Sequence, residues 1–178
     1  MIEDRFGSPA DITDALQAHF GPFDCDLAAE PWSAVVSRYI TEEQDVFKVR
    51  PRGKRGYMNP PYSRGSLVRF VGLARELVVA KHFESIALLV PHYSSEGWFR
   101  QVRRPEGKIL GAEDRYGQIR HPDMAEWTRY LWAGLTMDLI PIAGRVTFRF
   151  PPRYVGARES ARFSSIVVRF SSPEACPL

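Results

Sequence analysis

The segment GYMNPPYSRGS, residues 56–66, lies at the centre of the predicted fold. Three residues, Gly56-Tyr57-Met58, form a short apolar approach, and the consecutive prolines Pro60 and Pro61 then fix their own φ angles and lack an N–H donor. An apolar-periodic segment begins at Leu67, directly after this stretch. The pattern predicts a strand, a rigid tight turn and a helix, with polar and aromatic side chains held at the carboxyl end of the strand. In open α/β sheets, ligands bind at that edge.

Apolar periodicity predicts the elements on either side of this turn. Residues 67–80 repeat apolar side chains at helix spacing, and residues 86–90 are a continuous apolar run typical of a strand buried on both faces. The other expected helices are at 8–20, 32–39 and 94–102. The other expected strands are at 23–28, 135–142, 145–150 and 165–170, the last two as an antiparallel pair at the sheet edge.

The composition fits one compact domain spanning residues 1–178. The chain is 44% hydrophobic and 12% aromatic, which is enough for a full core. No apolar run is long enough to span a membrane, and no signal-peptide pattern follows Met1. Two distant cysteines, Cys25 and Cys176, favour a reducing cytoplasm. The histidines show no ligand spacing, so we expect no metal site.

Four residues, Asn59-Pro60-Pro61-Tyr62, suit a reaction at the amino group of a nucleobase. Such an amine is a poor nucleophile because its lone pair is delocalised into the ring, and acceptors facing both of its protons favour the pyramidal nitrogen that attacks a methyl group. The Asn59 side-chain oxygen and the Pro60 carbonyl are the predicted acceptors, and the Tyr62 ring would stack on a base taken out of its helix. Positioning and charge stabilisation can then carry the step. The structural alternative is a Pro-Pro turn with Tyr62 in the core.

These four residues also look like the catalytic motif of amino-group methyltransferases that use S-adenosylmethionine. Further matching pieces occur in the family's order: Ser8-Pro9, residues 21–29 (GPFDCDLAA), Asp45, residues 89–91 with Trp98-Phe99, and residues 144–148 (GRVTF). With all of these pieces in place, the chain resembles the compact phage-type, Dam-like DNA N6-adenine methyltransferases.

The resemblance implies a Rossmann-like α/β methyltransferase fold, with a mostly parallel sheet and an antiparallel edge hairpin. It implies S-adenosylmethionine as methyl donor, and double-stranded DNA with a flipped adenine as partner, in a bacterial host cytoplasm and encoded by a phage or prophage. The catalytic positions are Asn59, Pro60, Pro61 and Tyr62. The implied cofactor-binding residues are Ser8, Pro9, Asp24, Asp26, Ala28 and Asp45. Asp26 suits the cofactor's ammonium or ribose and Asp45 its adenine amino group; the alternative is that Asp24 and Asp26 cap a following helix.

Some features depart from the family pattern and leave other functions open. Ser8 stands where the family usually has threonine, Leu27 stands where it usually has proline, and no Gly-x-Gly loop follows the first predicted strand. The alternatives are an amino-group methyltransferase acting on RNA or protein glutamine, and a catalytically weak or inactive module that binds DNA or protein.

Arginine-rich segments indicate where DNA would be held, although the net charge of +3 does not by itself indicate a nucleic-acid partner. Residues 114–121 form a predicted loop whose Arg115 and Arg120 are candidates for target readout, with a structural role as an equal alternative. Beside it, Met124, Trp127, Tyr130 and Leu131 fall at helix spacing and are expected in the core. The loop 151–163 carries Arg153, Arg158 and Arg162, which we expect to contact phosphates because a guanidinium donates two parallel bonds. We expect no separate target-recognition domain.

Overall fold

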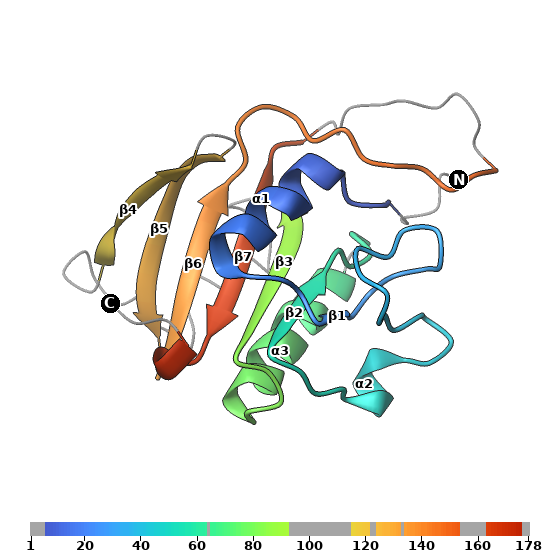
Figure 1. Ribbon diagram of the computed structural model, residues 1–178, viewed down its shortest axis with the longest axis horizontal. Helices are drawn as coiled ribbons and strands as arrows, with labels where there is room; N and C mark the ends of the chain where they lie inside the picture. The colour runs from blue at the N-terminus through green and yellow to red at the C-terminus, as the bar shows by residue number, and fades with distance from the viewer. Residues whose placement is uncertain are drawn as a thin grey trace.

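The computed structural model describes residues 6–63, 65–92, 115–121, 124–132, 134–153 and 163–175, with the backbone alone for 115–121 and 124–132. Seven strands form one sheet in the order β1-β2-β3-β7-β6-β5-β4 (Figure 1). The strands are β1 Cys25–Asp26, β2 Arg55–Met58, β3 Ser85–Pro91, β4 Arg115–His121, β5 Met124–Trp132, β6 Leu135–Pro141 and β7 Ser165–Ser171. The helices are α1 Ala10–Phe20, α2 Val46–Val49, α3 Ser66–Val79 and the 3-10 turn Pro173–Ala175.

The sheet is mixed, and the expectation that it would be mostly parallel is not confirmed. Among the described strands, β1, β2 and β3 pair in parallel, whereas β3–β7, β7–β6, β6–β5 and β5–β4 are antiparallel. The physical reason is the path of β7, which runs antiparallel to both of its neighbours in the middle of the sheet. Among the described residues, helix α3 forms the crossover between the parallel strands β2 and β3 that such pairing requires.

Two helices cover opposite faces of this sheet (Figure 1). Strand β3 is buried along its whole length, as its apolar run predicts. Its residues Ile86, Leu88 and Val90 share a core with α3, and the alternate residues Ala87 and Leu89 share a second core with α1. This period-two division follows from the strand geometry, because successive side chains point to opposite faces. The layers are therefore helix, sheet and helix.

Local sequence explains where the two long helices begin and end. The buried face of α1 contains Ile12 and Leu16, and the helix stops at Gly21, whose φ of 91° is open to glycine and whose N–H donates to the Gln17 carbonyl. Helix α3 buries Leu67, Val71, Ala74, Leu77 and Val78 on one side. Both helices agree with the predictions for 8–20 and 67–80. None of the helices within the described residues combines the length and apolar character needed to cross a bilayer.

The predicted helix at 32–39 is wrong. This segment forms turns and bends, because its backbone groups bond to β1 rather than to one another. The Asp26 N–H donates to the Arg38 carbonyl at 2.9 Å, and the Ile40 N–H donates to the Asp26 carbonyl at 2.8 Å. The Asp26 side chain accepts a hydrogen bond from the Val35 N–H. Those contacts compete directly with the i to i−4 bonds of a helix.

The predicted edge pairing of 145–150 with 165–170 is also wrong. Residues 165–170 belong to β7, whose two edges are occupied by β3 and β6 in the centre of the sheet. Residues 145–150 form no strand of the sheet; instead Gly7 and Arg149 make an isolated antiparallel bridge, with both N–H to carbonyl distances at 2.8 Å. The sheet does end in an antiparallel pair, but its strands are β4 and β5.

The expected loop at 114–121 and the helix spacing after it correspond to strands β4 and β5. Only two residues separate these strands in the chain, and His121 pairs with Met124. Aromatic and β-branched side chains favour a strand in 124–132, and pairing with both β4 and β6 outweighs the three-residue spacing of a few apolar positions. The helix expected at 94–102 lies outside the described residues.

Candidate active site

A cavity of about 530 Å³ opens at the carboxyl ends of β1 and β2. Its wall comes from four segments: residues 27–33 after β1, residues 40–47 around α2, the turn that follows β2, and the first part of α3. Phe6 from the amino-terminal segment completes it. Pockets for small molecules and cofactors span roughly 300–1,000 Å³, so this cavity has the right size for one. The site therefore lies at the sheet edge that the strand–turn–helix pattern predicted.

The predicted catalytic residue Asn59 lies on the wall of this cavity. Its Nδ2 group donates to the Phe6 carbonyl at 2.7 Å, and its Oδ1 accepts from the Tyr62 hydroxyl at 2.7 Å. The Tyr62 hydroxyl also lies 3.2 Å from the Leu89 carbonyl at the end of β3. Asn59 is thus held between the amino-terminal segment, its own turn and a central strand.

Of the other three residues of the motif, one lines the cavity and two pack in or against the core. Pro61 lines the cavity, whereas Pro60 is buried and lies outside the lining. The half-buried Tyr62 ring packs against Phe6, Phe148 and Phe163, with ring centroids 6.2, 5.9 and 5.6 Å apart. Tyr62 is therefore both a core aromatic and a partner of Asn59, and its stacking on a base remains a prediction.

Contacts with Arg149 hold the amino-terminal segment beside the cavity. Arg149 pairs with Gly7, and its guanidinium donates to the Ser8 carbonyl at 2.8 Å and to the Ser33 carbonyl at 3.0 Å. The Ser8 hydroxyl is buried and lies 2.7 Å from the Tyr57 hydroxyl. Burial raises the pKa of Tyr57, which keeps that phenol neutral. Ser8 and Pro9 do not line the cavity; they secure the segment from which Phe6 reaches it.

Asp26 stabilises the cavity wall through hydrogen bonds to backbone N–H groups. Its side chain is 2% exposed, and its two oxygens accept from the N–H groups of Ala28 at 3.3 Å and Val35 at 3.1 Å. Burial raises the pKa of Asp26 to about 6, although these hydrogen bonds and the charge of Arg149 oppose the rise. Asp26 itself is not part of the lining, but Ala28 is, so the carboxylate holds the wall in place.

Asp24 lies at the other end of β1, away from the cavity. Its Oδ2 accepts from the backbone N–H groups of both Lys54 and Arg55 at 2.6 Å. The carboxylate thereby fixes where β2 begins beside β1. It lies outside the lining, and it caps no helix, because turns and bends follow β1.

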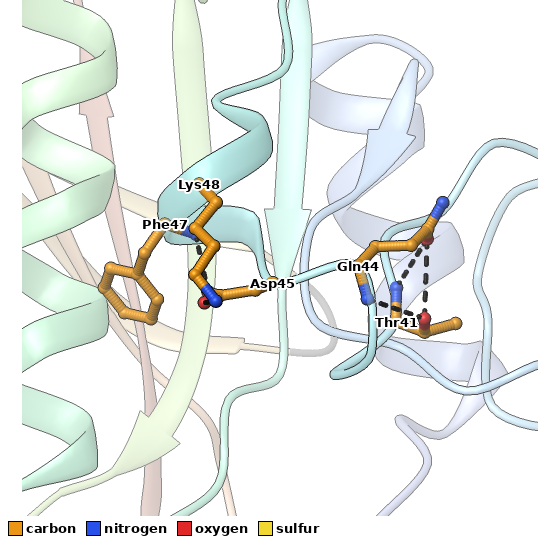
Figure 2. Close-up of polar contacts among 5 residues, drawn as sticks. All are labelled: Thr41, Gln44, Asp45, Phe47 and Lys48. Atoms are coloured by element: carbon orange, nitrogen blue, oxygen red, sulfur yellow. Dashed lines mark hydrogen bonds and ion pairs between the residues drawn. The ribbon is translucent and has the colours of Figure 1, made fainter.

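Asp45 lines the cavity from the turn before α2. Figure 2 shows the polar contacts of this turn. Thr41 and Gln44 build this turn reciprocally: the Gln44 Oε1 accepts from the Thr41 N–H at 2.9 Å, and the Thr41 hydroxyl accepts from the Gln44 N–H at 3.4 Å. Asp45 follows with a φ of 57°, its Oδ1 accepting from the Phe47 N–H at 3.1 Å and its Oδ2 lying 3.2 Å from the Lys48 Nζ. A positive φ at a residue other than glycine is uncommon, and such positions cluster at functional sites.

Sequence reasoning missed several residues of the wall. Beside Asp45, the acidic residues Glu30 and Glu42 line the cavity together with the basic residue Arg69. Arg69 lies 4.5 Å above the Phe47 ring, and this ring meets Phe70 edge-on with centroids 5.1 Å apart. The cavity therefore combines an acidic majority with aromatic faces. The acidic residues around Asp45 offer a signal for Glu42 in the sequence, whereas the apolar period of 67–80 offers none for Arg69.

The predicted DNA-contacting arginines are not brought together by the described part of the chain. Arg115 and Arg120 lie on β4 at the sheet edge, where only the backbone is described. Arg153 is exposed, and Arg158 and Arg162 lie outside the described residues. Within the described residues, no cluster of three or more His, Cys, Asp or Glu side chains could hold a metal ion.

Comparison with known proteins identifies the family. A sequence model of the DNA N-6-adenine-methyltransferase (Dam) family matches residues 1–149, well over half of the chain. The chain belongs to this family. That match contains every residue of the cavity wall, from Phe6 to Phe70.

Individual relatives of this Dam-family chain are more distant. A DNA N-6-adenine-methyltransferase of Escherichia phage T1 is 28% identical over 113 residues, which cover 63% of this chain and 46% of the phage protein. The chain therefore matches about half the length of that relative. A solved structure from Pyrococcus horikoshii, assigned as an RNA methyltransferase, aligns with a TM-score of 0.38 and 12% identity over 83% of this chain and 62% of that one.

Proposed function

We propose that this Dam-family protein transfers a methyl group from S-adenosylmethionine to the N6 amino group of adenine in DNA. The observation that carries the proposal is the position of Asn59, whose amide is held at the wall of a cofactor-sized cavity at the carboxyl ends of two parallel strands. Family membership supplies the substrate class. We further propose that the mixed sheet is a variant of the Rossmann-like methyltransferase fold, and that one domain both binds the cofactor and reads the target.

The cavity's side chains fit S-adenosylmethionine chemically. Glu30, Glu42 and Asp45 would supply anionic partners for the cofactor's ammonium and sulfonium, and Arg69 would pair with its carboxylate. The Phe47 and Phe70 rings offer faces for its adenine. When bound, the cofactor supplies an electrophilic methyl group. In this assignment Ala28 and Asp45 contact the cofactor directly, whereas Ser8, Pro9 and Asp26 hold the walls.

Asn59 orients the target amine for attack. One Oδ1 lone pair is used by the Tyr62 hydroxyl, and the second is available to accept a proton of the adenine amino group. A second acceptor in the turn, for which the Pro60 carbonyl is the candidate, would take the other proton and favour a pyramidal amine nitrogen. S-adenosylmethionine, when bound, would supply the methyl group that this nitrogen attacks, and the extra amine proton would pass to solvent. Such prearranged acceptors can supply a hundredfold or more in rate, on the order of the effect of one oxyanion-hole donor.

The substrate in this proposal is double-stranded DNA with the target adenine flipped out, within the bacterial host cytoplasm. A stacked and paired adenine cannot enter an active-site cavity with its amino group facing the catalytic residues, so the base must be extruded. The arginines of the loop 151–163 would hold the backbone, and Arg115 and Arg120 at the sheet edge would lie along the duplex.

Mass spectrometry of nucleosides tests the proposal. The purified protein is incubated with S-adenosylmethionine and duplex DNA, and the digest is searched for N6-methyladenine; parallel reactions contain RNA, duplexes of G and C alone, or protein from a cell extract. We expect product only with adenine-containing DNA, and none with Asn59→Ala. Methylation of RNA or glutamine in place of DNA would reassign the substrate, and cofactor binding without any methylated product would refute catalysis.

A further inference from the structure

The Tyr62 hydroxyl has a contact that a base-stacking role does not require. It donates to the Asn59 Oδ1 at 2.7 Å, while the Leu89 carbonyl lies farther from it at 3.2 Å. A hydroxyl carries one proton, so the shorter contact marks the amide oxygen as its main acceptor. Stacking on a base needs only the ring face. The hydroxyl therefore has a separate task that involves the Asn59 side chain.

The contacts of Asn59 fix which way its amide points. On one side lies the Phe6 carbonyl, which can only accept, at 2.7 Å from the Nδ2 group. A flipped amide would place Oδ1 against that carbonyl oxygen, two acceptors without a proton between them, which is strongly unfavourable in a partly buried site. With Nδ2 against Phe6, the Oδ1 faces the Tyr62 hydroxyl. The Phe6 carbonyl therefore selects this orientation, and the Tyr62 hydroxyl donates to the oxygen that then faces it.

The aromatic surroundings of Tyr62 make its hydroxyl a fixed reference point. Phe6, Phe148 and Phe163 surround the ring at centroid distances of 5.6–6.2 Å, in tilted and edge-on arrangements. Rings packed in this way lose most of their rotamer freedom. Phe6 is part of the same cluster, so the group of rings that holds the hydroxyl also holds the carbonyl on the other side of Asn59.

We propose that Tyr62 is a positioning residue, whose hydroxyl fixes the Asn59 amide so that the free Oδ1 lone pair faces the target amine. The inference deepens the proposed methyl transfer and rests on it. It assigns different tasks to the two parts of one side chain, because the ring packs the turn while the hydroxyl orients the acceptor. Tyr62→Phe separates these tasks, since phenylalanine keeps the ring and removes only the hydroxyl.

Steady-state kinetics of Tyr62→Phe give the first test. We expect kcat to fall by about tenfold, the size of one lost hydrogen bond, while the KM values for DNA and S-adenosylmethionine remain within about twofold. Tyr57→Phe is the comparison variant, because it removes another buried hydroxyl, whose 2.7 Å contact is to Ser8, and it leaves the Tyr62–Asn59 hydrogen bond in place. Its kcat should fall by no more than about twofold, because the lost contact touches only the segment that carries Phe6. An unchanged kcat in Tyr62→Phe, or an equal fall in both variants, would overturn the proposal.

A double-mutant comparison locates the effect. If the hydroxyl acts only through Asn59, then Tyr62→Phe should not slow the residual reaction of Asn59→Gln further, because a longer side chain has already lost the fixed geometry. A full tenfold fall in that background would show that the hydroxyl acts by another route.

A spectroscopic measurement keeps the inference testable without catalysis. In ¹H–¹⁵N spectra the side-chain amide signals of Asn59, assigned by their loss in Asn59→Ala, should move in Tyr62→Phe and stay in place in Tyr57→Phe. Unmoved signals in Tyr62→Phe would refute the positioning role. If the wild type makes no N6-methyladenine yet these signals move, the proposed reaction fails while the positioning of the amide stands.

Discussion

Replacing Asp26 by asparagine should change how the stability of this protein depends on pH. The carboxyl is 2% exposed, its pKa is raised to about 6 by burial, and its two oxygens accept the N–H groups of Ala28 and Val35. In the unfolded chain an aspartate titrates near pH 3.9. Between these two pH values the native state binds more protons than the unfolded state. The contribution of Asp26 to the free energy of unfolding is therefore complete below about pH 4 and is lost as the pH rises through about 6.

The size of the effect follows from the shift. A rise from 3.8 to about 6 corresponds to about 3 kcal/mol at roughly 1.4 kcal/mol for each pKa unit. Asparagine does not titrate, and its Nδ2 group cannot accept, so one of the two N–H groups loses its acceptor in the variant at every pH. The stability of the variant relative to the wild type should therefore rise by about 3 kcal/mol between about pH 4 and pH 7, on top of this constant loss.

Urea unfolding of both proteins across this range measures the difference directly. Every other carboxylate contributes equally to the two curves, so subtracting them isolates Asp26. A difference curve that stays flat, or one in which the variant loses stability with rising pH, would refute the burial argument.

The remaining predictions concern the cofactor, the catalytic residue and DNA. Asn59→Ala should abolish methylation, with a loss of about a hundredfold or more, while calorimetry shows cofactor binding close to wild type; full activity would sink the catalytic assignment. Asp26→Ala leaves two N–H groups of the cavity wall without their acceptor and should weaken S-adenosylmethionine binding by roughly 1.5–3 kcal/mol, more than it weakens DNA binding; unchanged cofactor affinity in calorimetry would limit Asp26 to stability. Converting Arg153, Arg158 and Arg162 to alanine should flatten the slope of log K against log[salt] for DNA binding by roughly three units with little change in sequence preference, and an unchanged slope would rule out phosphate contacts.

The elements nearest the site were predictable because each has a strong local signal. Residues 86–90 are apolar without interruption and form a strand buried on both faces, and the period in 67–80 matches the buried side of α3. The two prolines after Met58 leave a turn as the remaining choice. These three local signals are enough to place Asn59 at the carboxyl edge of the sheet.

Pairing between distant segments determined what the sequence did not predict. Residues 32–39 have helix-compatible composition, but β1 takes their backbone hydrogen bonds. Arg149 pairs with Gly7 across the chain, so residues 145–150 do not join the sheet. Arg69 enters the cavity wall because Phe47 on another helix meets it there, a contact that helix periodicity alone cannot show. In each case the deciding contact joins residues that are not neighbours in sequence.

The position of β7 has a consequence for how the protein is made. Residues 165–171 come last among the strands, yet they lie in the middle of the sheet and join β3 to β6. A nascent chain must expose the open edges of both strands until this segment leaves the ribosome, and unpaired edges invite association with other chains. A chain ended before residue 165 should therefore aggregate rather than fold as a smaller enzyme. The residues of the cavity wall, from Phe6 to Phe70, are therefore synthesised long before β7, the strand that joins the two parts of the sheet.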